Sequence, residues 1–301
     1  MSVKKFLRLD SVQSYILLAL PLIGFVVFTI YPLSWAISRS FFFYDTVDAH
    51  TKFRGLENFK MVFREVRYWS SWKTTILFTV VKVPIESFFA LVIAFILSGK
   101  LKGSGTYRSV FFFPTMISAV ITGVLFGNLF DYFGFINSFL MKLGILEEGI
   151  DWFGKYNTSV FVLILSSTWG TFGINMLYFI AGLSGISEDI YEAATIDGCN
   201  KVQLFFKMTI PMVAPVFRTI LLLAITGSLK VADEVIALTN GAPGGQTNTV
   251  GSFIITKFVP GFAENVSNIG YGCALSLVTA IIYIIVAIVY SRLSKKMKEV
   301  Y

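Results

Sequence analysis

The stretch that decides the fold is residues 187–211, SEDIYEAATIDGCNKVQLFFKMTIP, a polar loop between two long apolar segments. Ser187 can cap a first short helix, and Gly198 can adopt the left-handed conformation that ends it. Asn200 can cap a second helix, which Pro211 is expected to end because proline cannot continue a helix. The loop is therefore predicted to carry two short helices rather than a simple turn.

The charge of this loop favours a protein partner over a lipid surface. Its four acids, Glu188, Asp189, Glu192 and Asp197, outnumber two lysines. An anionic lipid surface or DNA would repel such a loop, which argues against an interfacial helix and against a DNA-binding helix-turn-helix. The short or small side chains of Glu192, Ala193 and Ala194 permit close approach by another surface. We interpret the loop as a docking site.

The composition indicates a membrane protein. Of the 301 residues, 55% are apolar and 14% are charged, whereas soluble domains average about 25% charged residues. The mean hydropathy is +0.72. The net charge of +7 fits Lys and Arg at anionic lipid, so membrane lipid is an expected partner and nucleic acid is not. Two cysteines and one histidine make a disulfide framework or a zinc site improbable, so no metal ligand and no catalytic residue is assigned.

Six segments are apolar enough to cross a bilayer, which requires about 20 residues each. The first is too long for a signal peptide and lacks its exit motif, so it is interpreted as an uncleaved span. The predicted fold class is all-α, a polytopic bundle of six transmembrane helices forming one domain over residues 1–301. The expected spans are 15–37, 74–97, 109–130, 158–183, 213–238 and 268–291, with the docking loop at 184–212 between the fourth and the fifth.

Positive charge predicts the orientation of these spans. Residues 39–73 hold seven Lys and Arg interleaved with aromatic residues, as in an interfacial amphipathic stretch. When that segment is set aside, the face that carries both termini and the docking loop has twelve Lys and Arg, and the other face has three. Both termini and the loop are therefore expected in the cytoplasm.

The loop resembles that of a known family, the permease subunits of binding-protein-dependent ABC importers. The matching residues are Glu192, Ala193, Ala194, Asp197, Gly198, Phe205, Phe206, Ile210, Pro211 and Pro215. Residues 53–59, FRGLENF, and 238–244, LTNGAPG, resemble the carbohydrate branch, which includes the maltose and glycerol-phosphate permeases. Cys199 departs from the pattern, since the family usually has alanine there, but it neither adds charge nor removes the turn.

The resemblance implies a permease that translocates a sugar or oligosaccharide by alternating access in a bacterial plasma membrane. The implied partners are a second permease subunit, expected to be a paralogue, two cytoplasmic ABC ATPases and an extracellular solute-binding protein. ATP and Mg²⁺ would bind to the ATPases, and this chain would bind no cofactor. The loop would then be a coupling helix seated in an ATPase. The implied coupling residues are Glu192, Ala193, Ala194, Asp197, Gly198, Phe205 and Pro211.

Charges inside the second and fifth spans need partners or water, because one charge at the bilayer centre costs about 2.5 to 3.5 kcal/mol on insertion scales. Lys82 and Glu86 are four residues apart, as are Lys230 and Glu234, so each pair can neutralise itself on one helix face. The alternative is a polar wall facing a sugar, which needs hydrogen-bonding groups beside aromatic rings. The candidates for such a pathway are Lys82, Glu86, Asn128, Trp169, Asn175, Tyr178, Lys230 and Asp233.

Two rival functions compete with that of an importer permease. Residues 149–155, GIDWFGK, imitate the start of a phosphate loop, but Tyr156 stands where Ser or Thr is required to hold magnesium, so no ATPase site is expected in this chain. A gradient-driven secondary transporter or channel is the main alternative. Such a protein would not need an acidic docking loop.

Overall fold

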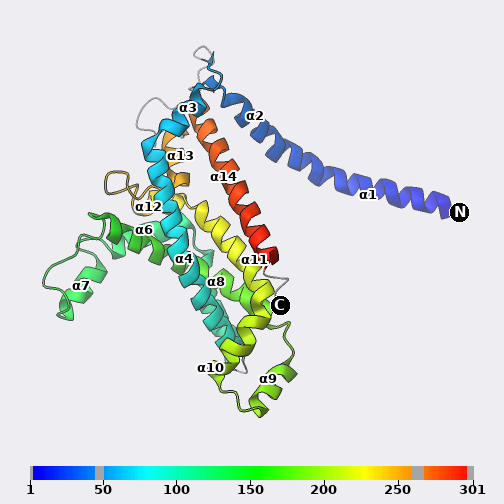
Figure 1. Ribbon diagram of the computed structural model, residues 1–301, viewed down its shortest axis with the longest axis vertical. Coiled ribbons are helices and arrows are strands. Elements are labelled where there is room, and N and C mark those ends of the chain that lie inside the picture. The colour runs from blue at the N-terminus through cyan, green and yellow to red at the C-terminus, as the bar shows by residue number, and fades with distance from the viewer. Residues whose placement is uncertain (1–2, 45–50, 100, 259–267, 297–301) are drawn as a thin grey trace. The chain divides into compact units, whose positions relative to one another are not determined.

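The computed structural model describes residues 3–44, 51–99, 101–258 and 268–296, with side chains from residue 13 to residue 294 within these ranges. These residues are almost entirely helical (Figure 1), and the only strands among them are β1 (Phe42–Phe43) and β2 (Lys52–Phe53), which pair antiparallel. Five helices are long and apolar enough to cross a membrane, and a bent helix pair can form a sixth crossing. The predicted all-α membrane fold is confirmed. The chain ends expected in the cytoplasm, 1–2 and 297–301, lie outside the described residues.

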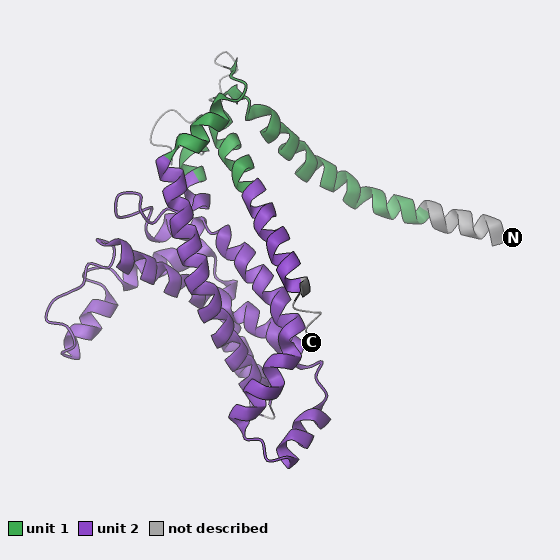
Figure 2. Cartoon of the chain, in the orientation of Figure 1, with its two compact units in different colours: residues 1–65, 254–280 green, residues 66–253, 281–301 purple. Residues whose placement is uncertain are grey.

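The chain divides into two units, which Figure 2 shows in different colours. Unit 1 comprises residues 1–65 and 254–280, and unit 2 comprises residues 66–253 and 281–301. The last helix, α14 (Ile269–Lys296), contributes residues to both units. The docking loop and all candidate pathway residues belong to unit 2.

Unit 1 begins with one long apolar segment and continues into a small ribbon. The segment comprises α1 (Val3–Phe25), the π-helical turn η1 (Val26–Ile30) and α2 (Tyr31–Arg39). No residue in its most apolar stretch of 18 residues is buried. After the ribbon, α3 (Glu57–Arg64) carries Asn58, whose Nδ2 donates to Ser40 O at 2.8 Å and to Phe42 O at 2.9 Å. The buried Asn58 side chain thus ties the end of α2 to the ribbon.

Unit 2 is built on three packed spans, α4 (Val66–Ser98), α8 (Tyr156–Leu183) and α11 (Ile210–Leu229). Their shared core contains Leu91 of α4, Phe179 of α8 and Ile220 of α11, all buried. Gly182 allows α8 to approach α11 closely, since a Cβ there would lie 2.8 Å from Val216 Cγ1. Unit 2 also contains α7 (Phe135–Lys142) and the loop helices described below, and α13 (Val250–Phe258) contributes residues to both units.

The third span differs from the expected helix at 109–130, because the chain bends by 94° inside it. The bend separates α5 (Ser104–Phe112) and the 3-10 turn η3 (Phe113–Met116) from α6 (Ala119–Leu129). Ser118 has extended backbone and caps α6 by accepting a hydrogen bond from Ile121 N at 3.3 Å. The span predicted at 109–130 is therefore two helices rather than one, and the missed signal is Pro114 followed by a capping serine.

The fifth span was predicted at 213–238, but its helix ends at Leu229. A break at residues 230–232 precedes a separate short helix, α12 (Asp233–Leu238). Thr249 Oγ1 donates to Val231 O at 2.6 Å, so this side chain supplies a hydrogen bond to a carbonyl within the break. The predicted continuation of the fifth span as one helix to residue 238 was wrong. Thr249, 18 residues after Val231, supplies a hydrogen bond at the point where the helix stops.

Pro211 was expected to end a short helix, and this was also wrong. The helix continues without interruption over Lys201–Leu229, through α10 (Lys201–Gln203), the π-helical turn η4 (Leu204–Thr209) and α11. The wider turn lies directly before Pro211, where the proline lacks an N–H donor and would crowd the preceding turn of a regular helix. Thr209 Oγ1 donates to Leu204 O, five residues back, at 3.2 Å. A π turn before a proline also occurs at η1, which precedes Pro32.

We expect Gly173→Ala to destabilise unit 2, because a Cβ at Gly173 of α8 would lie 2.4 Å from the backbone oxygen of Phe111. Overpacking of this kind costs about 1 to 3 kcal/mol. Gly227→Ala is the matched control, since Gly227 is also helical and a Cβ there meets nothing within 4 Å. Thermal unfolding of the purified protein in detergent measures the difference. A melting temperature for Gly173→Ala equal to that of Gly227→Ala would contradict the close approach.

Candidate functional site: the docking loop and the intramembrane polar network

The first helix of the loop, α9 (Glu188–Ile196), is closed at both ends by local interactions. Ser187 Oγ accepts a hydrogen bond from Asp189 N at 3.3 Å. Gly198 has a φ of +85°, and its N–H donates to Thr195 O at 3.0 Å. The predicted cap and the predicted left-handed stop are both confirmed.

The second helix begins with a complete capping box. Gln203 N donates to Asn200 Oδ1 at 2.9 Å, and Asn200 N donates to Gln203 Oε1 at 2.9 Å. Asn200 therefore caps this helix as predicted, and the box satisfies two backbone donors at once. Because the helix runs on into α11, the cap at Asn200 is the start of a membrane-spanning helix.

Phe205 anchors the loop in the bundle. It is 8% exposed and joins the core of α4, α8 and α11, and its ring centroid lies 5.1 Å from that of Phe95 on α4. Val202 and Phe206 are exposed, although a regular helix would place them on one face with Phe205 and Thr209. The π turn redirects these side chains, which no regular helical period could have predicted. Phe205 thus connects the loop mechanically to the spans.

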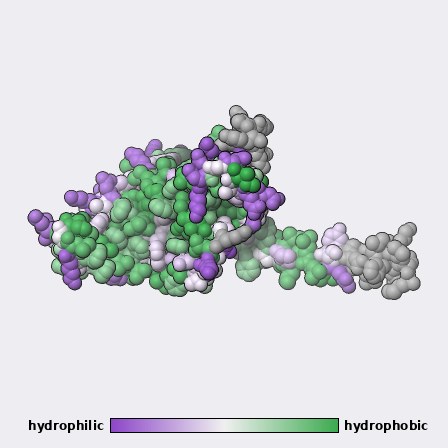
Figure 3. Space-filling view, turned by 90° about the horizontal axis from the view of Figure 1, so that it is seen from below, coloured by the Kyte–Doolittle hydropathy of each residue, from purple (hydrophilic) through white to green (hydrophobic). Residues whose placement is uncertain are grey.

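A second anchor holds α9 itself. Ala194 is 2% exposed, and the Tyr191 hydroxyl lies 3.3 Å from Thr209 Oγ1 of the π turn. The remaining surface of α9 is open: Ile196 is 86% exposed, and the other exposed residues include Glu188, Asp189, Glu192, Ala193, Asp197 and Gly198. Figure 3 views the molecule from below relative to Figure 1, which is the end where α9 and α10 lie, and hydrophilic side chains gather on this face. The exposed surface of α9 is therefore acidic, with Ile196 as its one large exposed apolar side chain. Pro211 is also exposed.

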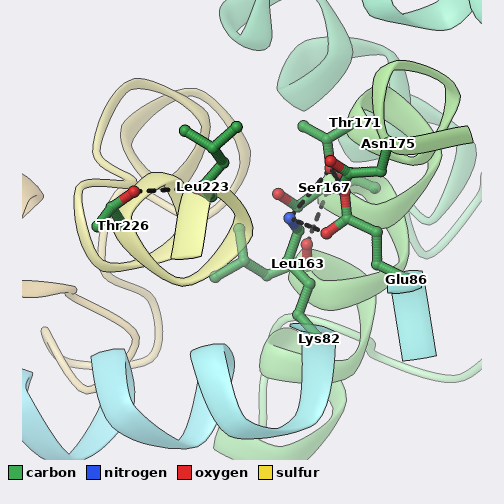
Figure 4. Close-up of polar contacts among 9 residues, drawn as sticks. Lys82, Glu86, Leu163, Ser167, Thr171, Asn175, Leu223 and Thr226 are labelled. Atoms are coloured by element: carbon green, nitrogen blue, oxygen red, sulfur yellow. Dashed lines mark hydrogen bonds and ion pairs between the residues drawn. The ribbon is translucent and has the colours of Figure 1, made fainter. Parts of the chain in front are cut away.

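Lys82, Glu86 and Asn175 meet in one polar network between α4 and α8 (Figure 4). Lys82 Nζ lies 2.7 Å from Glu86 Oε2 and donates to Thr171 Oγ1 at 3.0 Å. Glu86 Oε1 accepts from Asn175 Nδ2 and from Thr171 Oγ1, each at 2.7 Å. Lys82 is 4% exposed and Glu86 is 1% exposed. The charges are therefore neutralised within the pair and satisfied by α8, as the salt-bridge interpretation expected.

The predicted pairing of Lys230 with Glu234 was wrong. The helix breaks between them, Lys230 is exposed, and the buried Glu234 accepts a hydrogen bond from Ser166 Oγ of α8 at 2.6 Å. Sequence reasoning missed Ser166 and Thr171 as polar partners. The available signal was the run of hydroxyl residues at 166–168 and 171, which lies inside an otherwise apolar span.

The other pathway candidates stay apart from this network. Asn128 is exposed on α6 and donates to Val124 O of its own helix at 2.9 Å. Trp169 of α8 is half-buried, with its ring 5.6 Å from that of Phe126. Tyr178 is 41% exposed, and Asp233 is exposed at the start of α12. These side chains retain surface through which a solute or another subunit could be contacted.

A family model described as "Binding-protein-dependent transport system inner membrane component" matches residues 63–299. The chain belongs to this family of transport permeases. It is 32% identical over 296 residues, 98% of this chain and 94% of the other, to the probable ABC transporter permease protein YesP of Bacillus subtilis (strain 168). It is 30% identical to the arabinooligosaccharides transport system permease protein AraP of the same strain, covering 94% of this chain and 89% of AraP. The trehalose/maltose permease MalF of Thermococcus litoralis is also 30% identical, with coverage of 93% and 92%.

The fold of this permease is also that of a solved transporter. A chain in the crystal structure of a bacterial alginate ABC transporter, in complex with an alginate pentasaccharide-bound periplasmic protein, superposes with a TM-score of 0.81. The alignment covers 98% of each chain at 17% identity. At this identity the likeness supports the fold alone.

We expect Glu86→Ala to destabilise the permease by about 3 to 5 kcal/mol, because it leaves the Lys82 ammonium buried without its carboxylate. The double variant Lys82→Met/Glu86→Leu removes both charges and should recover much of that loss. Asn128→Ala, an exposed amide bonded only within its own helix, should change stability by less than about 0.5 kcal/mol. Thermal unfolding in detergent compares the three. If the double variant were less stable than Glu86→Ala, the network would not be the structural pair described here.

Proposed function

We propose that this permease forms part of the membrane pathway of an ATP-driven importer for a sugar or oligosaccharide delivered by an extracellular binding protein. The names of relatives support the substrate class, since these proteins transport arabinooligosaccharides and trehalose or maltose. The alginate transporter structure includes a periplasmic protein that carries an oligosaccharide, which supports delivery by a partner. The single observation that carries the proposal is a docking helix, α9, exposed on one side and clamped to the spans on the other.

In the proposed mechanism, α9 seats in a cytoplasmic ATPase and transmits its movement. Glu192, Ala193, Asp197 and Gly198 would form the contacting surface, and Ala194 would hold α9 against its own bundle. Because Phe205 is packed into the core of α4, α8 and α11, a displacement of the loop would be passed to three spans together. Pro211 would keep its π turn in place rather than touch the ATPase. The implied second permease, expected to be a paralogue, would have the corresponding loop on a second ATPase.

The proposed orientation places both termini and α9 in the cytoplasm of a bacterium, with the chain in the plasma membrane. The excess of Lys and Arg on that face supports it. ATP and Mg²⁺ would be bound by the ATPases. Residues 149–155 resemble the start of a phosphate loop, but they follow helix α7 rather than a strand and lead directly into α8. A phosphate loop follows a strand, so this arrangement does not support a nucleotide site in this chain.

For the substrate pathway we propose a division of labour among the candidate residues. Lys82, Glu86 and Asn175 would hold α4 to α8 and so shape the wall, since their hydrogen-bonding groups face one another. Asn128, Trp169 and Tyr178 would be available to contact the sugar, because each keeps exposed surface and aromatic rings suit sugar faces. Lys230 and Asp233 would border the break between α11 and α12.

We expect Gly198→Val to insert in the membrane but to lose ATPase capture and transport. A Cβ at Gly198 would meet nothing within 4 Å, so the cost is one of backbone conformation, because a β-branched residue strongly disfavours a φ of +85°. Gly198→Asn is the matched control, since asparagine tolerates the left-handed region. Co-purification of the ATPase and uptake of labelled oligosaccharide are the measurements. Normal capture and uptake by the valine variant would refute the coupling role.

Energy dependence separates the importer from its main alternative, a gradient-driven transporter or channel. Vesicles containing the permease pair and both ATPases should take up oligosaccharide from the binding protein only when ATP is hydrolysed. Vesicles that contain this chain alone should show no uptake driven by an ion gradient. Uptake by the chain alone under a proton or sodium gradient would overturn the importer proposal.

A further inference from the structure

The connection between α6 and α8 exposes large apolar side chains around α7. Phe133, just before the helix, is 87% exposed, and Phe135 at its start is 64% exposed. The ring of Phe135 stacks on that of Phe139, with centroids 5.9 Å apart, and Phe139 and Ile145 are also exposed. Exposed apolar side chains gathered in this way mark a surface that binds a protein or a membrane. We call these four side chains the α7 patch.

The α7 patch is held in place by one buried side chain of the same helix, Asn137. Asn137 Nδ2 donates to Tyr132 O at 3.0 Å, before the helix, and to Ile150 O at 2.8 Å, after it. Asn137 Oδ1 accepts from Trp152 Nε1 at 3.0 Å. These hydrogen bonds fix α7 to the chain on both sides of it, so the patch is preformed. A preformed surface loses little conformational entropy on binding.

The α7 patch and the docking helix α9 lie on opposite sides of the membrane. The helix α8 connects them as a single span, with the patch before its first residue and α9 after its last. This relation holds wherever the bilayer lies along α8. Because α9 is proposed to face the cytoplasm, the patch faces the outside of the cell.

The charges around the α7 patch favour a protein over a lipid surface. Residues 131–155 contain four acids and two lysines. Asp131 lies two positions before Phe133, Glu147 lies two positions after Ile145, and both acids are exposed. Inserting the patch into an anionic bilayer would bring these carboxylates to phosphate groups that repel them. In Figure 3, which keeps the left side of Figure 1, hydrophilic side chains border apolar ones at the α7 end.

We propose that the α7 patch docks the extracellular solute-binding protein, through an apolar surface of that protein bordered by Lys and Arg. Phe135 and Phe139 would be the central anchors, because aromatic side chains carry much of the binding energy at protein interfaces. Glu147 and Glu148 would attract the basic border. The identity of the partner rests on the proposed function, which includes an extracellular binding protein. The chemistry of the partner, an apolar centre with a basic border, is inferred from the patch alone.

Docking at this position would act on the membrane pathway through α8. Trp152 and Phe153, between α7 and α8, pack on a buried core that includes Leu163 of α8. Further along the same helix, Thr171 and Asn175 donate to Glu86 of α4. The binding protein would thus contact the outer end of a span whose inner end leads into α9.

The test measures the affinity of a binding protein for the complete transporter, with both permeases and the ATPases, in lipid nanodiscs. The probe is the solute-binding protein that stimulates ATP hydrolysis by this transporter. The variant Phe135→Ala/Phe139→Ala should weaken its binding about tenfold or more. The melting temperature of this variant should match that of the unaltered protein, since both side chains are exposed.

Two further variants test the charged border and the choice of surface. Glu147→Lys/Glu148→Lys should slow association at low ionic strength, and the difference should shrink at high salt because salt screens exposed charges. Phe88→Ala/Phe89→Ala is the matched control, since these are exposed phenylalanines in ring contact on α4. It should bind the probe like the unaltered protein.

A reporter variant separates protein from lipid as the occupant of the patch. The tryptophan emission added by Phe139→Trp should not be quenched by brominated phospholipid in the nanodisc. It should shift to shorter wavelengths when the binding protein is added. Quenching of the added emission by the brominated lipid would place the patch in the bilayer and overturn the proposal.

The outcomes distinguish this inference from the proposed function. If the unaltered transporter binds the probe and Phe135→Ala/Phe139→Ala binds it equally well, this inference alone fails. Loss of the second permease from that variant during purification would also overturn it, because the patch would then join the two permeases. If no solute-binding protein binds the unaltered transporter, the proposed function fails together with this inference.

Discussion

A membrane-spanning chain cannot leave a polar group facing hydrocarbon, and this constraint governs the polar groups inside the spans of unit 2. Lys82 is neutralised by Glu86, and the carboxylate is then satisfied by Thr171 and Asn175 of the adjacent span. The break after Leu229 is tolerated because Thr249 supplies a hydrogen bond to the freed carbonyl of Val231. The buried charge pair and the helix break therefore both have partners inside the protein, and the packing of α4 against α8 includes these polar contacts.

The features that sequence reasoning predicted correctly depend on neighbours along the chain. Ser187, Gly198 and Asn200 act within a few residues of themselves, so their capping and stopping roles follow from local chemistry. The all-α membrane class follows from apolar length alone. The docking loop is recognisable in the sequence because its caps, its glycine and its acidic charge all act locally.

The features that were missed depend on residues far away in the sequence. The partner of Glu234 is Ser166, 68 positions earlier, so the spacing of Lys230 and Glu234 gave no warning that the helix would break. The bend in the third span is supported by Gly173, whose missing side chain admits Phe111 of α5. Pro211 was expected to end a helix because the rule for proline assumes a regular helix, and the π turn at η4 removes that assumption.

The π turn η4 lies between the docking loop and the membrane helix α11, and it changes the direction in which the loop faces relative to that helix. Successive residues of an α-helix are rotated by about 100° around its axis, so the extra residue accommodated in η4 sets the direction in which everything before it faces. Phe205 lies within that turn, on the side that faces the core. The direction in which the docking loop faces therefore depends on the number of residues in this turn, and so does the place of Phe205 in the core. One short turn thus sets both the orientation of the docking loop and its attachment to the spans.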